Sequence, residues 1–201
     1  MNGSRAALDL LDAARVRPDD RILDVGGRTD ISRLPFEDGS FEVVVCRQRL
    51  QLLSDRELAL SEMRRVLMEG GRVVISVGGP IERSAAFAAL AESLERHAGA
   101  RVAAAVRWLF SLSDPEDLRA SLACAGFIDI RIDTDEETTV IPSVADLLRF
   151  VPRSGVDRSS LELTERTEGV VVAELVHELS PWIGVSGLEL TMDVHTAVAT
   201  R

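Results

Sequence analysis

The stretch ILDVGGRTDISRLPFEDGSFEVVV, residues 22–45, decides the fold of this 201-residue chain. Its first four residues form a short apolar run that stops at two glycines, a pattern typical of a buried strand. Residues 41–46 form a second buried strand, since they are rich in β-branched side chains. The fifteen residues between them, 26–40, have no helical periodicity and include a turn signal at 37–40. Two buried strands are therefore joined by an irregular connection.

Helices and strands alternate along the rest of the chain, which favours an α/β domain with a mainly parallel sheet. Gly70-Gly71 is expected to end the first long helix, and Ser113-Asp114-Pro115-Glu116 to begin a later one that ends near Gly126. We expect one domain over residues 1–201, with an antiparallel strand at the end of the sheet. The apolar periodicity predicts helices at 4–16, 55–68, 82–98, 101–109, 143–151 and 159–179, and strands at 72–77, 127–133 and 188–199.

The composition is that of a globular protein, with 46% hydrophobic and 28% charged residues. A net charge of −10 argues against nucleic acid or an anionic membrane as a partner, because both require basic patches. A small molecule or another protein fits better. Cys46 and Cys124 lack any CxxC spacing, so we expect two small buried thiols in a cytoplasmic protein. No apolar run reaches membrane-spanning length, and the N-terminus does not resemble a signal peptide.

Three ordered motifs resemble the class I S-adenosylmethionine-dependent methyltransferases, in particular the small-molecule enzymes related to quinone biosynthesis. Residues 22–26 resemble their first-strand motif, and residues 30–45 resemble their fourth-strand motif. Residues 58–74, including Glu62-Met63-Arg64-Arg65-Val66-Leu67, resemble the helix and fifth strand that follow. The resemblance implies a Rossmann-like sheet with helical cap segments at about 82–126 and 142–187.

The chain departs from this family in one place. The resemblance implies a glycine-rich loop, two helices and two strands between Asp24 and Asp30, which here are six positions apart. On the order of fifty residues are missing relative to an ordinary βαβαβ half. By resemblance, the remaining cofactor residues are Asp24, Gly26, Gly27, Asp30 and Ile31, and we expect them to be vestigial. Asp30 is expected to cap its own loop, and the chain alone is expected to hold no cofactor.

The gap also predicts a structural consequence. The sheet should lose two strands and their helices, which leaves the edge of the strand at 21–25 unpaired and one sheet face partly bare. Exposed edges and apolar patches promote association. We therefore expect a homodimer or a heteromer through this edge.

Polar residues that follow the fourth-strand motif are the best candidates for a substrate pocket, because open α/β sheets bind ligands at the carboxyl ends of their strands. These residues are Gln48, Arg49 and Gln51. Trp108, Phe110 and Phe150, and also Trp182, lie in the helical insertions that cap substrates in the related enzymes, although core packing explains such aromatics equally well. His195 is a weak catalytic candidate, because a lone histidine is usually structural. The acidic run at 133–137 reads as a solvated loop, and no metal site is expected.

These observations leave several functions open. The chain could have lost methyl transfer and serve as a small-molecule-binding or partner subunit. It could instead be a cofactor-independent enzyme of the cyclase or isomerase type that uses the old substrate pocket. A third possibility is a methyltransferase whose site is rebuilt by dimerisation, and a fourth is a deletion without evolved function. The sequence does not decide whether the chain is an enzyme.

Overall fold

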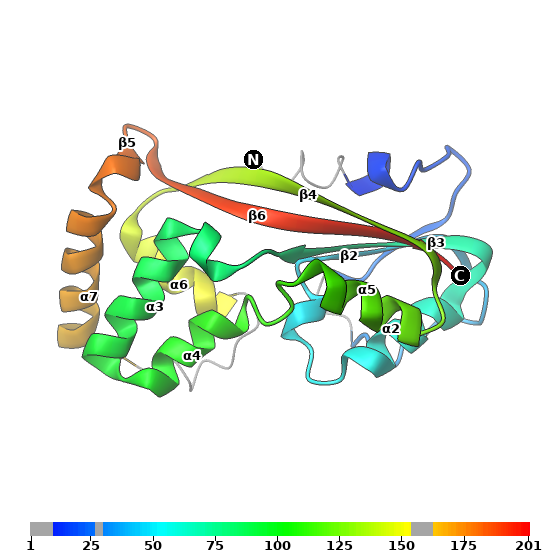
Figure 1. The fold of residues 1–201 in the computed structure, drawn as a ribbon, viewed down its shortest axis with the longest axis horizontal. Helices are drawn as coiled ribbons and strands as arrows, with labels where there is room; N and C mark the ends of the chain where they lie inside the picture. Colours follow the sequence, from blue (N-terminus) through cyan, green and yellow to red (C-terminus); the bar gives the residue numbers. More distant parts are fainter. Residues whose placement is uncertain (1–9, 27–29, 154–162) are drawn as a thin grey trace. The chain divides into compact units, whose positions relative to one another are not determined.

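The computed structural model describes residues 10–26, 30–153 and 163–201 (Figure 1). The chain divides into two compact units, which are described separately. The first contains the described residues up to Val77, Leu112–Asp135 and Val194–Arg201. The second contains Gly78–Ser111 and the described part of Glu136–Asp193. Residues 112–126, expected as part of a cap segment, thus belong to the first unit.

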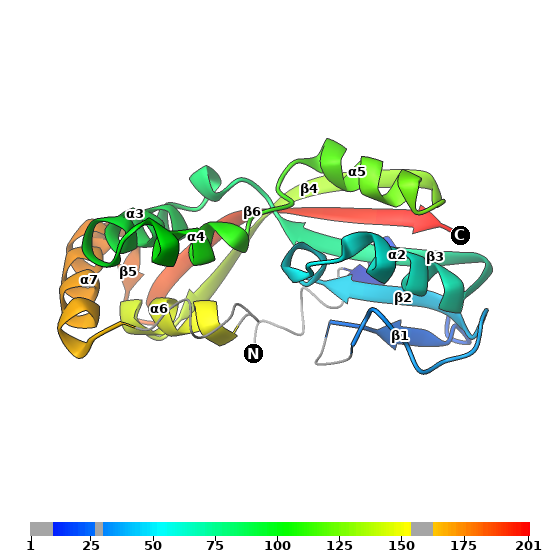
Figure 2. The same cartoon turned by 90° about the horizontal axis from the view of Figure 1, so that it is seen from below.

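The first unit is built on an open sheet whose strands follow the order β1-β2-β3-β6-β4 (Figure 2). Parallel pairs join β1 to β2 and β2 to β3. Strand β6 runs antiparallel to β3, since Arg201 N donates to Gly71 O at 2.9 Å while Gly79 N donates to Asp193 O at 2.8 Å. The bounds of these strands are β1 Ile22–Asp24, β2 Phe41–Arg47, β3 Leu67–Gly78, β4 Ile128–Ile141 and β6 Gly187–Thr200. Among the described residues, β1 is the end strand of this α/β sheet.

Alternation along the strands separates two faces of the sheet. Val44 and Cys46 of β2 point into a core that two helices cover, α2 (Arg56–Val66) and α5 (Pro115–Cys124). These helices contribute buried leucines such as Leu60 and Leu118 to that core. Both begin at an aspartate cap: Asp55 accepts from Leu58 N, and Asp114 accepts from Glu116 N. The cap at Asp114 confirms the predicted helix start.

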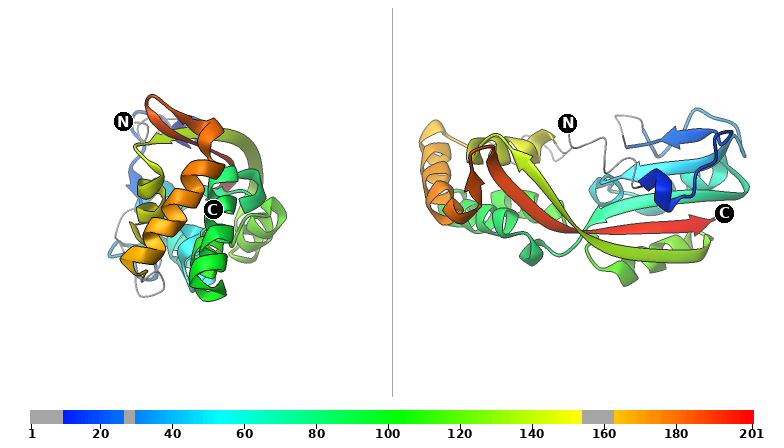
Figure 3. Two further views of the ribbon diagram at one scale, coloured as in Figure 1. Left: turned by 90° about the vertical axis from the view of Figure 1, so that its left-hand side faces the viewer. Right: turned by 90° about the horizontal axis from the view of Figure 1, so that it is seen from above.

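The opposite face of the sheet is covered by a short helical segment at residues 10–13 (Figure 3, right). Leu10 and Ala14 pack there against Val43, Val45 and Val74 of β2 and β3. The sequence predicts a helix at 4–16, and its described part ends earlier, with Arg15 at a φ of 49°. Its residues 4–9 lie outside the described part of the chain.

The second unit contains four α-helices in its described residues: α3 (Ala85–Ala98), α4 (Ala100–Trp108), α6 (Val144–Arg153) and α7 (Glu165–Glu178) (Figure 1). Glu174 of α7 joins this helix to α3. Its carboxylate accepts from Ser93 Oγ at 3.0 Å, lies 2.6 Å from His97 Nε2 and forms an ion pair with Arg96. A two-residue strand, β5 (Ile183–Gly184), pairs antiparallel with β6 and was not predicted.

Two predicted boundaries are wrong. Helix α2 ends at Val66, and Gly70-Gly71 lies inside β3, because Leu67 already pairs with Phe41 of β2. The acidic run at 133–137 is part of β4 and not a loop. Its side chains are exposed, so the charges stay solvated while the strand extends to Ile141. Beside the run, Thr138 of β4 hydrogen-bonds Thr191 of β6 at 2.9 Å.

No helix within the described residues combines the length and the apolar character needed to cross a bilayer.

Candidate functional site

The carboxyl end of β1 carries a tight turn. Asp24 Oδ1 accepts from Gly26 N at 2.7 Å, which folds the chain back at the end of the strand. A Cβ atom at Gly26 would lie 3.0 Å from that oxygen and 3.5 Å from Arg47 O. Gly26 therefore allows the backbone to approach the end of β2 closely. Gly27, the next predicted cofactor residue, lies outside the described part of the chain.

Asp30 caps its own loop, as the sequence predicts. Its Oδ1 accepts from Ser32 N at 3.0 Å and from Ser32 Oγ at 2.5 Å. These hydrogen bonds, with a smaller contribution from the charge of Arg49, hold the pKa of Asp30 below its usual value. A carboxylate that is ionised in this way can still accept from a ligand through its other oxygen. The side chain of Ile31 is buried in the hydrophobic core.

The polar candidates after β2 meet at the carboxyl end of the sheet. Gln48 has a φ of 48°, a left-handed conformation uncommon outside glycine, and its N–H donates to Ser76 O at 2.9 Å. Gln51 is buried, and its Nε2 donates to Gln48 Oε1 at 3.1 Å. Arg56 Nη2 donates to Gln51 O at 3.1 Å. Backbone strain of this kind clusters at binding sites, so Gln48 strengthens the case for a site here.

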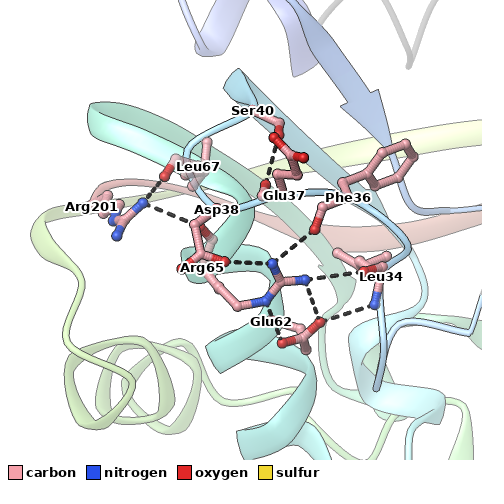
Figure 4. Close-up of polar contacts among 9 residues, drawn as sticks. All are labelled: Leu34, Phe36, Glu37, Asp38, Ser40, Glu62, Arg65, Leu67 and Arg201. Atoms are coloured by element: carbon pink, nitrogen blue, oxygen red, sulfur yellow. Dashed lines mark hydrogen bonds and ion pairs between the residues drawn. The ribbon is translucent and has the colours of Figure 1, made fainter.

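A group of contacts that sequence reasoning missed holds the connection between β1 and β2 (Figure 4). Arg65 of α2 donates from Nη2 to Leu34 O at 3.0 Å and from Nη1 to Phe36 O at 2.8 Å. Glu62, one turn earlier, accepts from Leu34 N at 3.0 Å and from Arg65 Nε at 2.7 Å. Asp38 accepts from Arg65 Nη1 at 2.7 Å. We call Glu62 and Arg65 the loop clamp.

The pKa values of the clamp follow from these contacts. Hydrogen bonds to Glu62 and Asp38 raise the pKa of Arg65, and the hydrogen bond from Arg65 lowers the pKa of Glu62. Both side chains therefore stay charged across the whole neutral range. The spacing of Glu62 and Arg65 on one helix face was visible in the sequence, but their partners lie about 30 positions away along the chain.

The aromatic candidates belong to the second unit. Phe110 is buried, and its ring packs against Phe87 with centroids 5.2 Å apart. Phe150 is 43% exposed and lies 5.8 Å from Phe87. Trp108, at the end of α4, is 44% exposed. The structure thus brings Phe110 and Phe150 together around Phe87, a residue that the sequence reasoning did not single out.

His195 is buried in the first unit, and both of its ring nitrogens contact the protein. Its Nε2 lies 2.8 Å from Ser113 O and its Nδ1 lies 2.8 Å from Thr134 Oγ1. A carbonyl oxygen only accepts, so Nε2 carries the proton and Nδ1 accepts from the threonine hydroxyl. The ring therefore has a structural role: it joins β6 to Ser113, the residue before the α5 cap.

Metal-ligating side chains do not converge in the described part of the chain, where no group of three His, Cys, Asp or Glu could hold an ion.

S-adenosylmethionine, the cofactor that the resemblance implies, needs partners for its methionine, ribose and adenine parts. The Asp24–Gly26 turn and the Asp30 carboxylate lie after β1, where such a ligand would be held. At Gly26 a Cβ would meet Asp24 and Arg47, so this glycine allows the turn itself to close against the end of β2. A second strand with an acidic tip has no counterpart between residues 24 and 30. The residues present therefore fit part of the cofactor and leave the ribose side open.

Comparisons with known proteins agree with this fold. Residues 6–75 match the family described as "Methyltransferase domain". The malonyl-[acyl-carrier protein] O-methyltransferase of Geobacter sulfurreducens is 30% identical over 134 residues, which cover 65% of this chain and 48% of that enzyme. The ubiquinone/menaquinone biosynthesis C-methyltransferase UbiE of Ralstonia pickettii is 29% identical over 169 residues, which cover 80% of this chain and 59% of that enzyme. The chain thus spans about half to three fifths of the length of these relatives.

A solved structure shows the same fold. The chain resembles that of a proposed methyltransferase from Bacillus halodurans with a TM-score of 0.55 and 16% identity, over 96% of this chain and 97% of the other. At this level of identity the likeness concerns the fold.

These comparisons correct two expectations. The expected loss of methyl transfer, with a role as a binding or partner subunit, is wrong, because the relatives are named methyltransferases and the domain match favours that activity over a non-catalytic role. The expectation of no cofactor is not supported either, since it depended on the same assumed loss. The chain is therefore similar to the class I methyltransferases: residues 6–75 match the methyltransferase domain, and the sheet has the Rossmann-like fold of a solved relative.

Proposed function

We propose that the chain is an S-adenosylmethionine-dependent methyltransferase that acts on a small molecule. The observation that carries this proposal is the position of Asp24, Gly26 and Asp30. All three lie within the residues that match the methyltransferase domain, and they flank the carboxyl end of β1. Ligands of open α/β sheets bind at this end of the strands.

Each residue has a separate task in this proposal. Asp24 fixes the turn through its bond to Gly26 N, and Gly26 lets this turn close against Arg47 at the end of β2, where the cofactor would be held. Asp30, ionised and held by Ser32, accepts from the amino group of the nucleoside. The cofactor, when bound, supplies an activated methyl group. Gln48, whose amide oxygen accepts from the buried Gln51, presents its amide nitrogen to the substrate, and positioning of the two reactants supplies most of the acceleration.

Calorimetric titration tests this proposal. S-adenosylmethionine and S-adenosylhomocysteine should bind the unaltered chain, and Asp30→Ala should weaken both at least about tenfold, as expected for the loss of a charge-assisted hydrogen bond. Asp19→Ala is the matched control, because it removes one exposed carboxylate that lies before β1. Absence of binding in the unaltered chain would overturn the proposal.

We also propose that a second copy of the chain joins at the edge of β1. Arg21 O accepts from Val43 N, and Val25 N donates to Val45 O, so these groups face β2. In a parallel pair, Ile22 and Asp24 then direct their backbone groups away from β2. Among the described residues this edge is unpaired, which favours the addition of a strand, and Ile22 is 40% exposed there.

Light scattering after size exclusion tests this association. The unaltered chain should be dimeric, and Ile22→Pro should favour the monomer, since proline removes the outward N–H and leaves the bonds between β1 and β2 in place. Ile22→Val is the control. A monomer at high concentration would contradict the proposed dimer.

We further place the protein in the cytoplasm, and its charge of −10 argues against nucleic acid as a partner.

A further inference from the structure

A helix normally orders the crossover between two parallel strands. In its described part, residues 25–26 and 30–40, the connection between β1 and β2 contains neither helix nor strand. Its backbone is instead bound by side chains. The N–H and C=O of Leu34 are both engaged by the loop clamp, and the C=O of Phe36 accepts from the same arginine (Figure 4).

The clamp acts on the segment that carries Asp30. Leu34 follows Asp30 by four positions, and its side chain is buried in the core with that of Ile31. Asp30 and Ser32 form a closed turn at the other end of this segment. The segment is thus fixed at one end by its own turn, whose middle residue Ile31 is buried in the core, and at the other end by α2.

We infer that Arg65 is a positioning residue for the nucleoside end of the cofactor. It acts through the backbone of Leu34 and Phe36, which holds the Asp30 turn at the carboxyl end of β1. This inference rests on the proposed function, because Asp30 is the residue that would contact the cofactor. Arg65 itself touches neither cofactor nor substrate.

The geometry makes the two members of the clamp non-interchangeable. Leu34 O needs a donor from position 65, and Leu34 N needs an acceptor from position 62. A guanidinium can reach Leu34 O and Phe36 O together because its donors form a rigid fork, which lysine lacks. An ordinary ion pair would survive an exchange of its charges, whereas this clamp would not.

Two measurements on the same variants test the inference. Arg65→Lys should weaken the binding of S-adenosylhomocysteine by about tenfold or more, as expected when a binding group is displaced, and should speed amide hydrogen exchange in residues 30–40. The double variant Glu62→Arg/Arg65→Glu should not restore either property. Arg201→Ala is the matched control: Arg201 donates to the carbonyl oxygens of Arg65 and Leu67, which lie outside the 30–40 loop.

The outcomes separate the two proposals. A variant Arg65→Lys that binds S-adenosylhomocysteine as tightly as the unaltered chain overturns the positioning role and leaves the proposed function standing. Restored affinity in the charge-exchanged variant would also overturn it, since the pair would then act only through its charge. Failure of the unaltered chain to bind overturns the proposed function itself, whatever the exchange rates of residues 30–40 show.

Discussion

The Nε2 atom of His195 donates to the backbone carbonyl of Ser113 across 2.8 Å, which ties the middle of β6 to the residue before the α5 cap. The opposite ring nitrogen accepts from Thr134 Oγ1 at 2.8 Å. A buried ring with both nitrogens satisfied is a cross-link between three segments of the first unit. It resembles a structural histidine more than a general base.

Replacing His195 should therefore reduce stability and spare cofactor binding. We expect His195→Ala to lower the free energy of unfolding by about 2–3 kcal/mol, because two partners lose their hydrogen bonds inside the protein. Thr134→Val removes only one of these bonds and should cost about 1 kcal/mol. Urea unfolding measures both values, and titration with S-adenosylhomocysteine at low temperature measures binding. A loss of binding in a variant that stays folded would contradict the structural role.

Acid should weaken the junction between β1 and β2. The Glu42 carboxylate accepts from Arg21 N at 2.7 Å and from its guanidinium at 2.9–3.2 Å, and these hydrogen bonds lower the pKa of Glu42 to about 2. A carboxyl group whose pKa is lower in the folded state stabilises the protein above its unfolded pKa of 4.5, and this stability is lost as the pH falls toward 2.

We expect the melting temperature to fall more steeply between pH 4.5 and 2 in the unaltered chain than in Glu42→Gln. Circular dichroism at a series of pH values measures this difference. In Arg21→Ala, the pKa of Glu42 measured by NMR should return toward its ordinary value. An unchanged titration in that variant would show that Arg21 is not the cause.

The parts of the fold that depend on local pattern were predictable. The Asp114 cap could be recognised because its donor, Glu116 N, lies two positions away. The end of α2 was misplaced because the pairing of Leu67 with Phe41, 26 positions earlier, overrides the glycine signal at 70–71. The acidic part of β4 was predicted as a loop for a related reason, because its pairing with β6 is not visible in the local sequence.

The candidate site was predictable to a similar extent. The family motif pointed to Asp24, Gly26 and Asp30, and the capping role of Asp30 follows from a neighbour two positions away. The clamp was not predicted, since Glu62 and Arg65 engage backbone atoms of Leu34, 28 and 31 positions away. Backbone acceptors carry no sequence signal, so only the fold reveals which loop a charged helix face holds.

The two cysteines should differ in reactivity, contrary to the expectation that both are buried. Cys46 is buried, which raises the pKa of its thiol to about 12, whereas Cys124 at the end of α5 is exposed. Because the thiolate is the reactive form, we expect a thiol reagent to label one cysteine in the folded protein and two after denaturation. Cys124→Ser should abolish labelling of the folded protein. Labelling that persists in Cys124→Ser would show that Cys46 is accessible.

Replacing either of two glycines in the second unit by alanine should change the melting temperature, but in opposite directions. Gly187 has a φ of +125°, and a Cβ there would lie 2.1 Å from Ile141 O, so Gly187→Ala must displace the backbone of β4 or β6. Gly169 lies within α7 with open space around it, and alanine is the better helix former by about 0.5–1 kcal/mol. We expect Gly169→Ala to raise the melting temperature and Gly187→Ala to lower it by several degrees. Equal effects in a thermal scan would contradict the close approach of Gly187 to Ile141, since both substitutions add the same methyl group and differ only in what that group meets.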